Sequence, residues 1–260
     1  MRRIAAFALA LAMGIPLFAQ TPAGFRHTVY NASLKLNHAE LGLEAPMSVC
    51  TATAFRKVEK GYLLVTAAHC VVKEGTAGGA GPYYAPLPDG RLSVEYGNPG
   101  ERHIQIPVLI QSVGNWHEGW DVAILSAETN LPLTVIPLGD DTKMAMGDPV
   151  VSVSAPLDGS IKLWLEGYIS AKMDQIEPDT PKNQPIWRNT VLLQLPGDLG
   201  SSGAPVVSPD QRAIVGIFVG IYRGPEADIV ATCMVPASSI KAFMADPRAH
   251  TGIVPNHRAK

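Results

Sequence analysis

A pair of serines lies between glycines in the segment 197–207, which reads Gly-Asp-Leu-Gly-Ser-Ser-Gly-Ala-Pro-Val-Val. Glycine lets a backbone turn sharply and lets a substrate carbonyl approach it closely. A serine on such a turn can present its hydroxyl beside backbone N–H groups, and acyl transfer needs this combination of a nucleophile and an oxyanion hole. Clusters of Gly, Ser and Pro are more often plain turns, so nucleophilic chemistry also requires a base and an orienting acid elsewhere in the chain.

His69 and Asp121 could supply that base and that acid. His69 follows the apolar run 61–66, and a metal site is disfavoured because no C-x-x-C or H-x-x-x-H spacing accompanies it. Asp121 opens the apolar segment 121–125. A buried aspartate must be hydrogen-bonded or paired, because leaving it bare is costly. It can cap a turn or accept a hydrogen bond from a histidine N–H, and these residues alone leave both alternatives open.

Residues 1–19 are predicted to form a secretory signal peptide. A short positive start, Met1-Arg2-Arg3, precedes an apolar run over 4–17, and cleavage is expected after Ala19. The run is too short to span a membrane comfortably, and no other segment approaches that length. The mature chain is therefore expected to be secreted or periplasmic, with no membrane span.

The chain has three cysteines, and export permits a disulfide between two of them. Cys50 and Cys70 are close in sequence and flank two strand-like runs, which favours their pairing. Closing a loop of that size stabilises a fold by roughly 3 kcal/mol in the chain-entropy model. Cys233 lies in the apolar run 230–235 and is interpreted as a buried small hydrophobe rather than a reactive thiol.

Composition and charge narrow the function classes. The 260 residues carry a net charge of −2, and the 21 Lys and Arg residues do not exceed the 23 Asp and Glu residues. Because there is no basic run either, a nucleic-acid partner is not expected. The 24 glycines and 22 prolines are many for a helical protein and typical of an all-β protein with many turns.

Short β-like runs separated by turn residues must position the reactive side chains. Strands are expected over 48–55, 61–66, 91–96, 103–113 and 120–125, and then over 149–154, 161–170, 190–195, 204–207, 213–222 and 228–235. Residues 20–44, which alternate around 27–30, are expected to form an N-terminal arm or an entry strand. Residues 74–90, with five glycines and three prolines, are expected to form a long exposed loop.

This pattern predicts an all-β protein of two β-barrels followed by a short helix. The first barrel is assigned to 45–132 and the second to 148–236, with a linker over 133–147. Ser238 is expected to cap the amphipathic helix, and the helix and a polar tail occupy 237–260.

Three motifs resemble those of the chymotrypsin-like (trypsin-like) serine proteases. Thr-Ala-Ala-His-Cys at 66–70 resembles the family's histidine motif, and Asp-Val-Ala-Ile-Leu at 121–125 resembles its aspartate motif. Gly-Ser-Ser-Gly-Ala-Pro-Val at 200–206 resembles its G-x-S-G-x-P nucleophile motif. The order histidine, aspartate, serine and the separations of 52 and 81 residues also fit, whereas an α/β-hydrolase places its serine first. The resemblance covers roughly residues 45–245.

The resemblance implies a fold of two six-stranded antiparallel barrels and a role for each motif residue. Ser202 attacks the peptide carbonyl, His69 accepts and returns the proton, and Asp121 fixes the histidine tautomer. The backbone N–H groups of Gly200 and Ser202 form the oxyanion hole. It also implies a disulfide between Cys50 and Cys70. The expected function is that of an exported serine endopeptidase acting on protein or peptide substrates, with no cofactor and no metal.

Two departures from the family indicate a bacterial type of member. Digestive members carry an aspartate before the nucleophile, where this chain has Ser201, and the chain has no Ile-Val-Gly-Gly-like start after a basic residue. It is more similar to the protease domains of the HtrA group and to the glutamyl endopeptidases. Activity without N-terminal zymogen cleavage is therefore expected.

The substrate pocket is less well defined by the sequence. Its wall is expected at Val219, Gly220 and Ile221, and its base near 196–199 and 231–233. A small or apolar residue is expected at the cleaved position. A preference for Lys or Arg would instead require Asp198 to turn inward.

Two other functions compete with a peptidase. A catalytically silent relative of the same fold could act as a binding module, because a collapsed oxyanion hole would disable the site without changing any triad residue. Acyl transfer to a small ester or amide is the other alternative.

Overall fold

The structure of the protein is a computed structural model that describes residues 22–38, 47–76, 82–87, 90–97, 103–116, 119–155, 161–176, 187–197, 199–223 and 230–247. The predicted signal peptide, residues 1–19, lies outside these ranges. Among the described residues, no helix is both long and apolar enough to cross a membrane.

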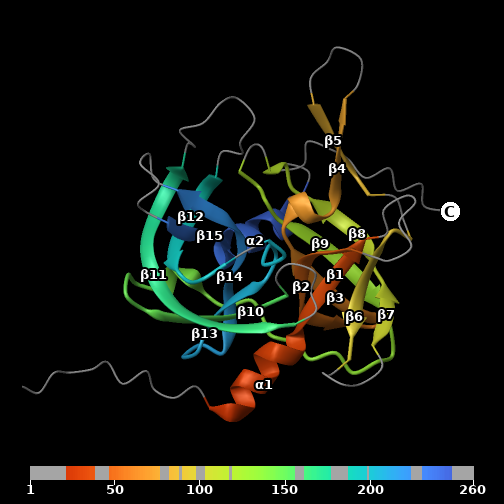
Figure 1. Cartoon of the computed structure of the whole chain (residues 1–260), viewed down its shortest axis with the longest axis horizontal. Coiled ribbons are helices and arrows are strands. Elements are labelled where there is room, and N and C mark those ends of the chain that lie inside the picture. Colours follow the sequence, from red (N-terminus) through yellow and green to blue (C-terminus); the bar gives the residue numbers. More distant parts are fainter. Residues whose placement is uncertain are drawn as a thin grey trace, which may run out of the picture.

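The described chain forms two antiparallel β units that lie side by side (Figure 1). The first is a seven-stranded sheet in the order β7-β6-β1-β2-β3-β9-β8. Its strands are β1 (Ser33–His38), β2 (Met47–Val58), β3 (Gly61–Thr66), β6 (Leu92–Tyr96), β7 (Ile104–Pro107), β8 (Leu109–Val113) and β9 (Ala123–Glu128).

The second unit is a closed barrel in the order β10-β11-β12-β15-β14-β13. Its strands are β10 (Pro149–Ser154), β11 (Leu163–Ile176), β12 (Trp187–Gln194), β13 (Pro205–Ser208), β14 (Ala213–Arg223) and β15 (Val230–Pro236). An all-β protein with two β units and a short C-terminal helix is thus confirmed. The closed unit has the six strands expected, whereas the first unit is an open sheet with one strand more.

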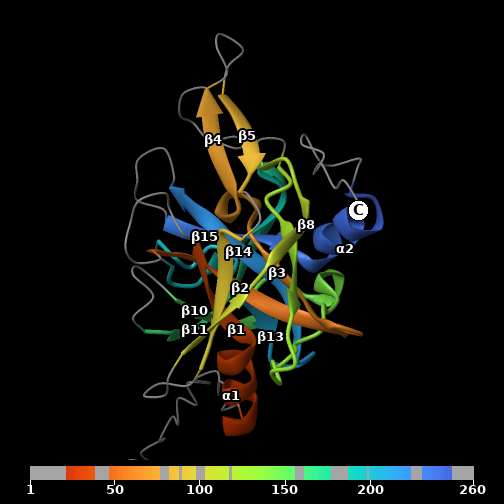
Figure 2. The ribbon, with the colours of Figure 1, turned by 90° about the vertical axis from the view of Figure 1, so that its right-hand side faces the viewer.

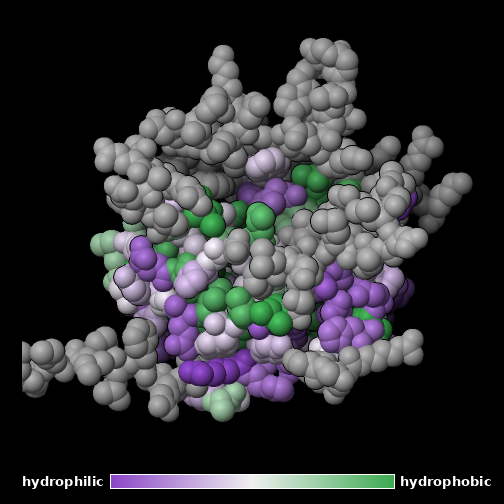
Figure 3. Space-filling view, in the orientation of Figure 1, coloured by the Kyte–Doolittle hydropathy of each residue, from purple (hydrophilic) through white to green (hydrophobic). Residues whose placement is uncertain are grey.

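Apolar side chains from both units form one large buried cluster, which packs the units together. Its members include Leu64, Val94, Leu125, Ile214, Val235 and Phe243. A smaller cluster belongs to the second unit and includes Val150, Ile169, Leu193, Val206 and Met234. Figure 3 shows the face of the molecule seen in Figure 1, on which apolar residues gather near the middle and polar residues surround them.

The additional strand comes from the segment that the sequence assigned to an arm. The strand expected around residues 27–30 is wrong, because these residues lie in α1 (Ala23–Ala32). Phe25, Val29 and Ala32 recur at the spacing of a helix and bury one face of it. The chain then enters β1, which pairs with both β2 and β6.

The long exposed loop expected over residues 74–90 is also wrong in part. Residues 74–76 and 82–86 of this segment belong to a two-stranded sheet of β4 (Val72–Thr76) and β5 (Pro82–Pro86), which projects from the body of the molecule (Figures 1 and 2). The prolines at the two ends of β5 are compatible with an edge strand, where a missing N–H is tolerated. The single strand expected over 103–113 is likewise divided into β7 and β8.

The C-terminal helix α2 (Ala237–Ala245) begins one residue before the expected Ser238 cap. Asp141 performs the capping instead: its carboxylate accepts hydrogen bonds from Ser238 N (2.6 Å) and Ser238 Oγ (3.0 Å). The first N–H groups of a helix have no partner within the helix, and a carboxylate satisfies them well. The predicted linker, in which Asp141 lies, thereby holds α2 in place.

Candidate active site

His69 and Asp121 come together because β3 and β9 are neighbours. These strands pair antiparallel, with Thr66 at the end of β3 opposite Ala123 at the start of β9. His69 follows in the 3-10 helix η1 (Ala68–Cys70), and Asp121 lies just before Ala123, so both leave the sheet at the same end. The His69 backbone N–H donates to Asp121 Oδ1 (3.0 Å), and Nδ1 of the His69 ring lies 2.7 Å from Oδ2. Both carboxylate oxygens thus hold the histidine.

Burial governs the electrostatics of this pair. Asp121 has 1 % of its side chain exposed, and His69 has 28 % exposed. Burial lowers the pKa of His69, but the charge of Asp121 and its hydrogen bond raise that pKa more, so it lies above its ordinary value. A carboxylate at this place accepts a hydrogen bond from Nδ1–H, which leaves the Nε2 lone pair able to take a proton from a nucleophile.

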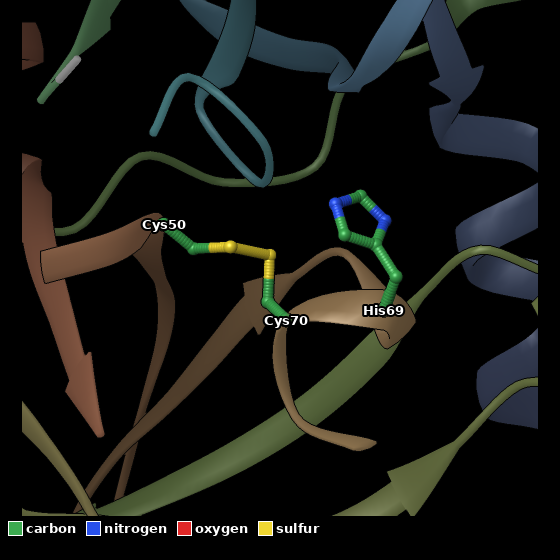
Figure 4. A group of neighbouring side chains, drawn as sticks. All are labelled: Cys50, His69 and Cys70. Carbon is green, nitrogen blue, oxygen red and sulfur yellow. A yellow bond between two sulfur atoms is a disulfide. The ribbon is translucent and has the colours of Figure 1, made fainter. Parts of the chain in front are cut away.

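A disulfide between Cys50 and Cys70 joins β2 to η1, with the two Cα atoms 6.1 Å apart. Figure 4 shows the imidazole of His69 beside this bridge, on the residue next to Cys70. In the described part of the chain, these three side chains are the one group of potential metal ligands within 4.8 Å of one another. Because the two sulfur atoms are bonded to each other, we assign them a structural role: they fix the position of the residue next to Cys70.

Ser202 lies on the turn that leads into β13. Gly200 and Gly203 have φ angles of 91° and 80°, in the left-handed region that favours glycine. A Cβ on Gly203 would lie 2.1 Å from the carbonyl oxygen of Thr51, so a side chain cannot be accommodated there. Ser202 is half-buried, whereas Ser201 is fully buried, so Ser202 is the more accessible serine of the pair.

Thr51, the residue after Cys50, holds this turn against the first β unit. Its N–H donates to Ser202 O (2.8 Å), and its hydroxyl donates to Gly200 O (3.0 Å). Ala155 N–H donates to the same hydroxyl (3.2 Å), and Thr66 Oγ1 donates to Thr51 O (2.8 Å). We call these bonds of Thr51 and Thr66 the threonine clamp. Sequence reasoning did not single out Thr51, and its one local signal is its place beside a disulfide cysteine.

The structure brings together some of the predicted site residues and not others. His69 and Asp121 are in contact, and the two residues predicted to form the oxyanion hole, Gly200 and Ser202, share one turn. In the described ranges, no hydrogen bond joins Ser202 to His69. Such a bond is often long in a free enzyme and shortens when substrate binds.

The expected substrate wall lies on β14. Val219 is buried, Gly220 and Ile221 are half-buried, and the pairing with β15 shifts register just before Gly220. Asp198, the acid that would favour a basic substrate residue, lies outside the described residues.

Phe218 connects this wall to the nucleophile turn. Its carbonyl oxygen accepts a hydrogen bond from Gly203 N (2.7 Å), and its N–H donates to Ala204 O (2.9 Å). The strand that would line the substrate is therefore bonded directly to the residues that follow Ser202.

Comparison with known sequences finds similarity to peptidases. A family model described as the trypsin-like peptidase domain matches residues 51–217. A probable periplasmic serine endoprotease DegP-like of Rickettsia prowazekii (strain Madrid E) is 26% identical over 124 residues, which is 48% of this chain and 23% of that protein. A protein of the same name from Rickettsia conorii (strain ATCC VR-613 / Malish 7) is also 26% identical, over 24% of its length. The match thus spans about a quarter of these relatives.

Three solved structures with the same fold come from Magnetospirillum magneticum, M. tuberculosis and Yersinia pestis. The MamO protease domain from Magnetospirillum magneticum (apo form) has a TM-score of 0.61 at 17% identity, covering 84% of this chain and 98% of that one. The active form of the Rv3671c protease from M. tuberculosis has a TM-score of 0.61 at 16% identity, covering 92% and 89%. The serine endoprotease from Yersinia pestis has a TM-score of 0.58 at 16% identity, covering 88% and 69%. At these identities the likeness is one of fold.

Proposed function

Because the chain belongs to the trypsin-like peptidase domain family, we propose that it is a serine endopeptidase with Ser202, His69 and Asp121 as its catalytic triad. One observation carries the proposal: the buried Asp121 carboxylate holds both the backbone N–H and the ring Nδ1 of His69. A carboxylate in this place fixes the imidazole in the tautomer whose Nε2 can act as a base, as in other serine proteases.

The proposed reaction has two stages. Ser202 Oγ attacks the substrate carbonyl while His69 Nε2 takes the hydroxyl proton, and the N–H groups of Gly200 and Ser202 stabilise the oxyanion. The C–N bond then breaks, His69 gives its proton to the leaving amine, and an acyl-enzyme remains on Ser202. Water, activated by the same imidazole, hydrolyses this ester and regenerates the free serine. Asp121 stays ionised throughout and stabilises the imidazolium.

We further propose that the protein is exported and is active without N-terminal trimming. The curated relatives carry the word periplasmic in their names, and the Cys50–Cys70 disulfide is typical of an oxidising compartment. Ser201 stands where zymogen-type relatives have the aspartate that binds a new N-terminus. Reaction of the signal-processed protein with a fluorophosphonate, before any trimming, is the expected result; inertness until trimming would refute this part.

A catalytically silent binding module is the second candidate, since Ser202 and His69 share no hydrogen bond in the described structure. A fluorophosphonate probe and a casein digest separate the two, applied to the wild type, to Ser202→Ala and to the neighbouring Ser201→Ala as the matched control. A peptidase is expected to label and digest in the wild type and Ser201→Ala, but not in Ser202→Ala. Labelling that persists in Ser202→Ala would show that a residue other than Ser202 is the nucleophile. Labelling without casein cleavage favours a narrow substrate or a small ester, and no labelling favours the binding module.

A further inference from the structure

Phe218 is a large apolar side chain that is buried outside both apolar clusters. Its neighbours on β14, Ile217 and Val219, belong to the large cluster that joins the two units. Phe218 itself is 3% exposed, yet among the described residues it is a member of neither the large nor the small cluster. Its ring is therefore buried by contacts outside these two apolar clusters.

The ring of Phe218 fills the space beside Gly197. A Cβ added to Gly197 would lie 2.4 Å from Cε2 and 2.5 Å from Cζ of the Phe218 ring, and 3.2 Å from Cγ2 of Thr232. The far edge of the ring is thus packed against the Gly197 backbone, with the Thr232 methyl next to it. Glycine at 197 is what allows the ring to enter.

This packing lies between the two segments that lead to the nucleophile. Gly197 precedes Ser202 on the chain by five residues, and Phe218 is bonded through its backbone to the two residues after Ser202. Thr232, on β15, pairs with Ile221 of the expected wall. These are the wall and base expected to enclose the substrate side chain that precedes the cleaved bond. The Phe218 ring thus lies where the inner end of that pocket is expected, and neither of the two side chains that meet beside Gly197, those of Phe218 and Thr232, is charged.

We infer that Phe218 sets the size of the substrate residue that precedes the cleaved bond, limiting it to alanine or a similarly small side chain. This inference rests on the proposed peptidase function. A pocket whose inner end holds a ring cannot also hold an aromatic or a long basic side chain, and one methylene misfit costs about 10–200-fold in kcat/KM. Truncation of the Phe218 side chain at Cβ would leave room for a substrate side chain as large as the ring that was removed.

The test compares peptides that differ only at this position, with Ala, Val, Leu or Phe. The wild type is expected to cleave after Ala at least about 100-fold more efficiently than after Phe, as several misfitting groups imply. Phe218→Ala is expected to reverse this order in favour of Leu or Phe, and Phe218→Val is a milder variant that keeps the strand apolar. Phe25→Ala is the matched control, because Phe25 is a buried phenylalanine of α1 outside the pocket. It should keep the wild-type order.

Binding to inactive proteins separates this inference from the proposed function. Dissociation constants of the same intact peptides are measured with Ser202→Ala and with Ser202→Ala/Phe218→Ala. If the wild type cleaves after Phe as well as after Ala, or if folded Phe218 variants keep the wild-type order, the inference falls and the peptidase stands. If nothing is cleaved but Ser202→Ala binds the Ala peptide at least about tenfold more tightly, and loses this selectivity with Phe218→Ala, the inference stands and the peptidase falls. Absence of both cleavage and selective binding refutes both.

Discussion

Replacement of Thr51 by valine tests whether the threonine clamp positions the nucleophile turn. Valine keeps the shape of threonine and removes only the hydroxyl, which donates to Gly200 O (3.0 Å) and accepts from Ala155 N (3.2 Å). Both backbone groups belong to buried residues, so each loses its partner without gaining water. An unsatisfied buried group costs about 1–3 kcal/mol, so the free energy of unfolding should fall by about 2–6 kcal/mol.

The same substitution should also lower kcat. Gly200 O belongs to the peptide between the two N–H groups proposed for the oxyanion hole, so its release lets both groups move. A shift of about 1 Å in such a site costs about 10²-fold in rate, and we expect kcat to fall by about 10–100-fold with KM changed less. Urea unfolding gives the stability, and steady-state cleavage of a peptide gives the rate.

Two variants control for this reasoning. Thr51→Ser keeps the hydroxyl and should retain most of the wild-type kcat. Thr53→Val lies on the same strand, where the buried Thr53 hydroxyl has no hydrogen-bond partner among the described residues, so it should leave both stability and rate nearly unchanged. If Thr51→Val behaves like Thr53→Val, the clamp does not position the turn. If stability falls while kcat stays at the wild-type value, the clamp supports the fold alone.

Three further predictions concern the rest of the site. Activity should rise with pH through a His69 pKa above its ordinary 6.5, because only the neutral ring is a base; Asp121→Asn should lower that midpoint in a pH–rate profile and cut kcat by about 10⁴-fold. Gly203→Ala should destabilise by about 2–5 kcal/mol in urea, because its Cβ would meet the clamp at a left-handed φ; an unchanged unfolding midpoint would contradict the geometry. Cys50→Ser should lower the free energy of unfolding by roughly 3 kcal/mol, because it removes the disulfide. The melting temperature should fall accordingly, and added reductant should not lower it further in this variant.

The raised pKa of His69 also determines how the stability of the fold changes with pH. The pKa of His69 is raised in the folded protein, so the proton binds more tightly there than in the unfolded chain. The stabilisation from the ionised pair is full below the ordinary pKa of histidine and is lost as pH rises through the folded value. Activity and this part of the stability therefore change in opposite directions over the same pH window.

The sequence predicted the second β unit well because its signals are local. The strand expected over 149–154 is β10 as observed, since apolar residues there run continuously between turn residues. The first unit was harder to predict. Residues 27–30 alternate like a strand, yet tertiary packing of Phe25, Val29 and Ala32 selects a helix. The two-stranded sheet of β4 and β5 has the glycines and prolines of a loop.

The features of the site that the sequence did not reveal are long-range ones. The Thr51 hydroxyl bonds Gly200 across 149 residues of chain, and no local pattern encodes a hydrogen bond of that separation. Phe218 looks like any other apolar residue of a buried strand, because burial patterns do not say whether a ring lies in a core or in a pocket. The bond of Thr51 becomes visible only when the two units are placed together, and the contacts of Phe218 become visible only when the strands of the second unit are paired.

The division of the proposed triad between two β units has a consequence for the life of the protein. His69 and Asp121 belong to the first unit, Ser202 to the second, and Thr51 bonds the second unit from the first. A chain with only one unit folded holds either a base without a nucleophile or a nucleophile without a base. Chemistry therefore starts only when folding is complete, and a partly folded copy is harmless to the unfolded chains around it. Separation of the two units would likewise part the proposed nucleophile from its base.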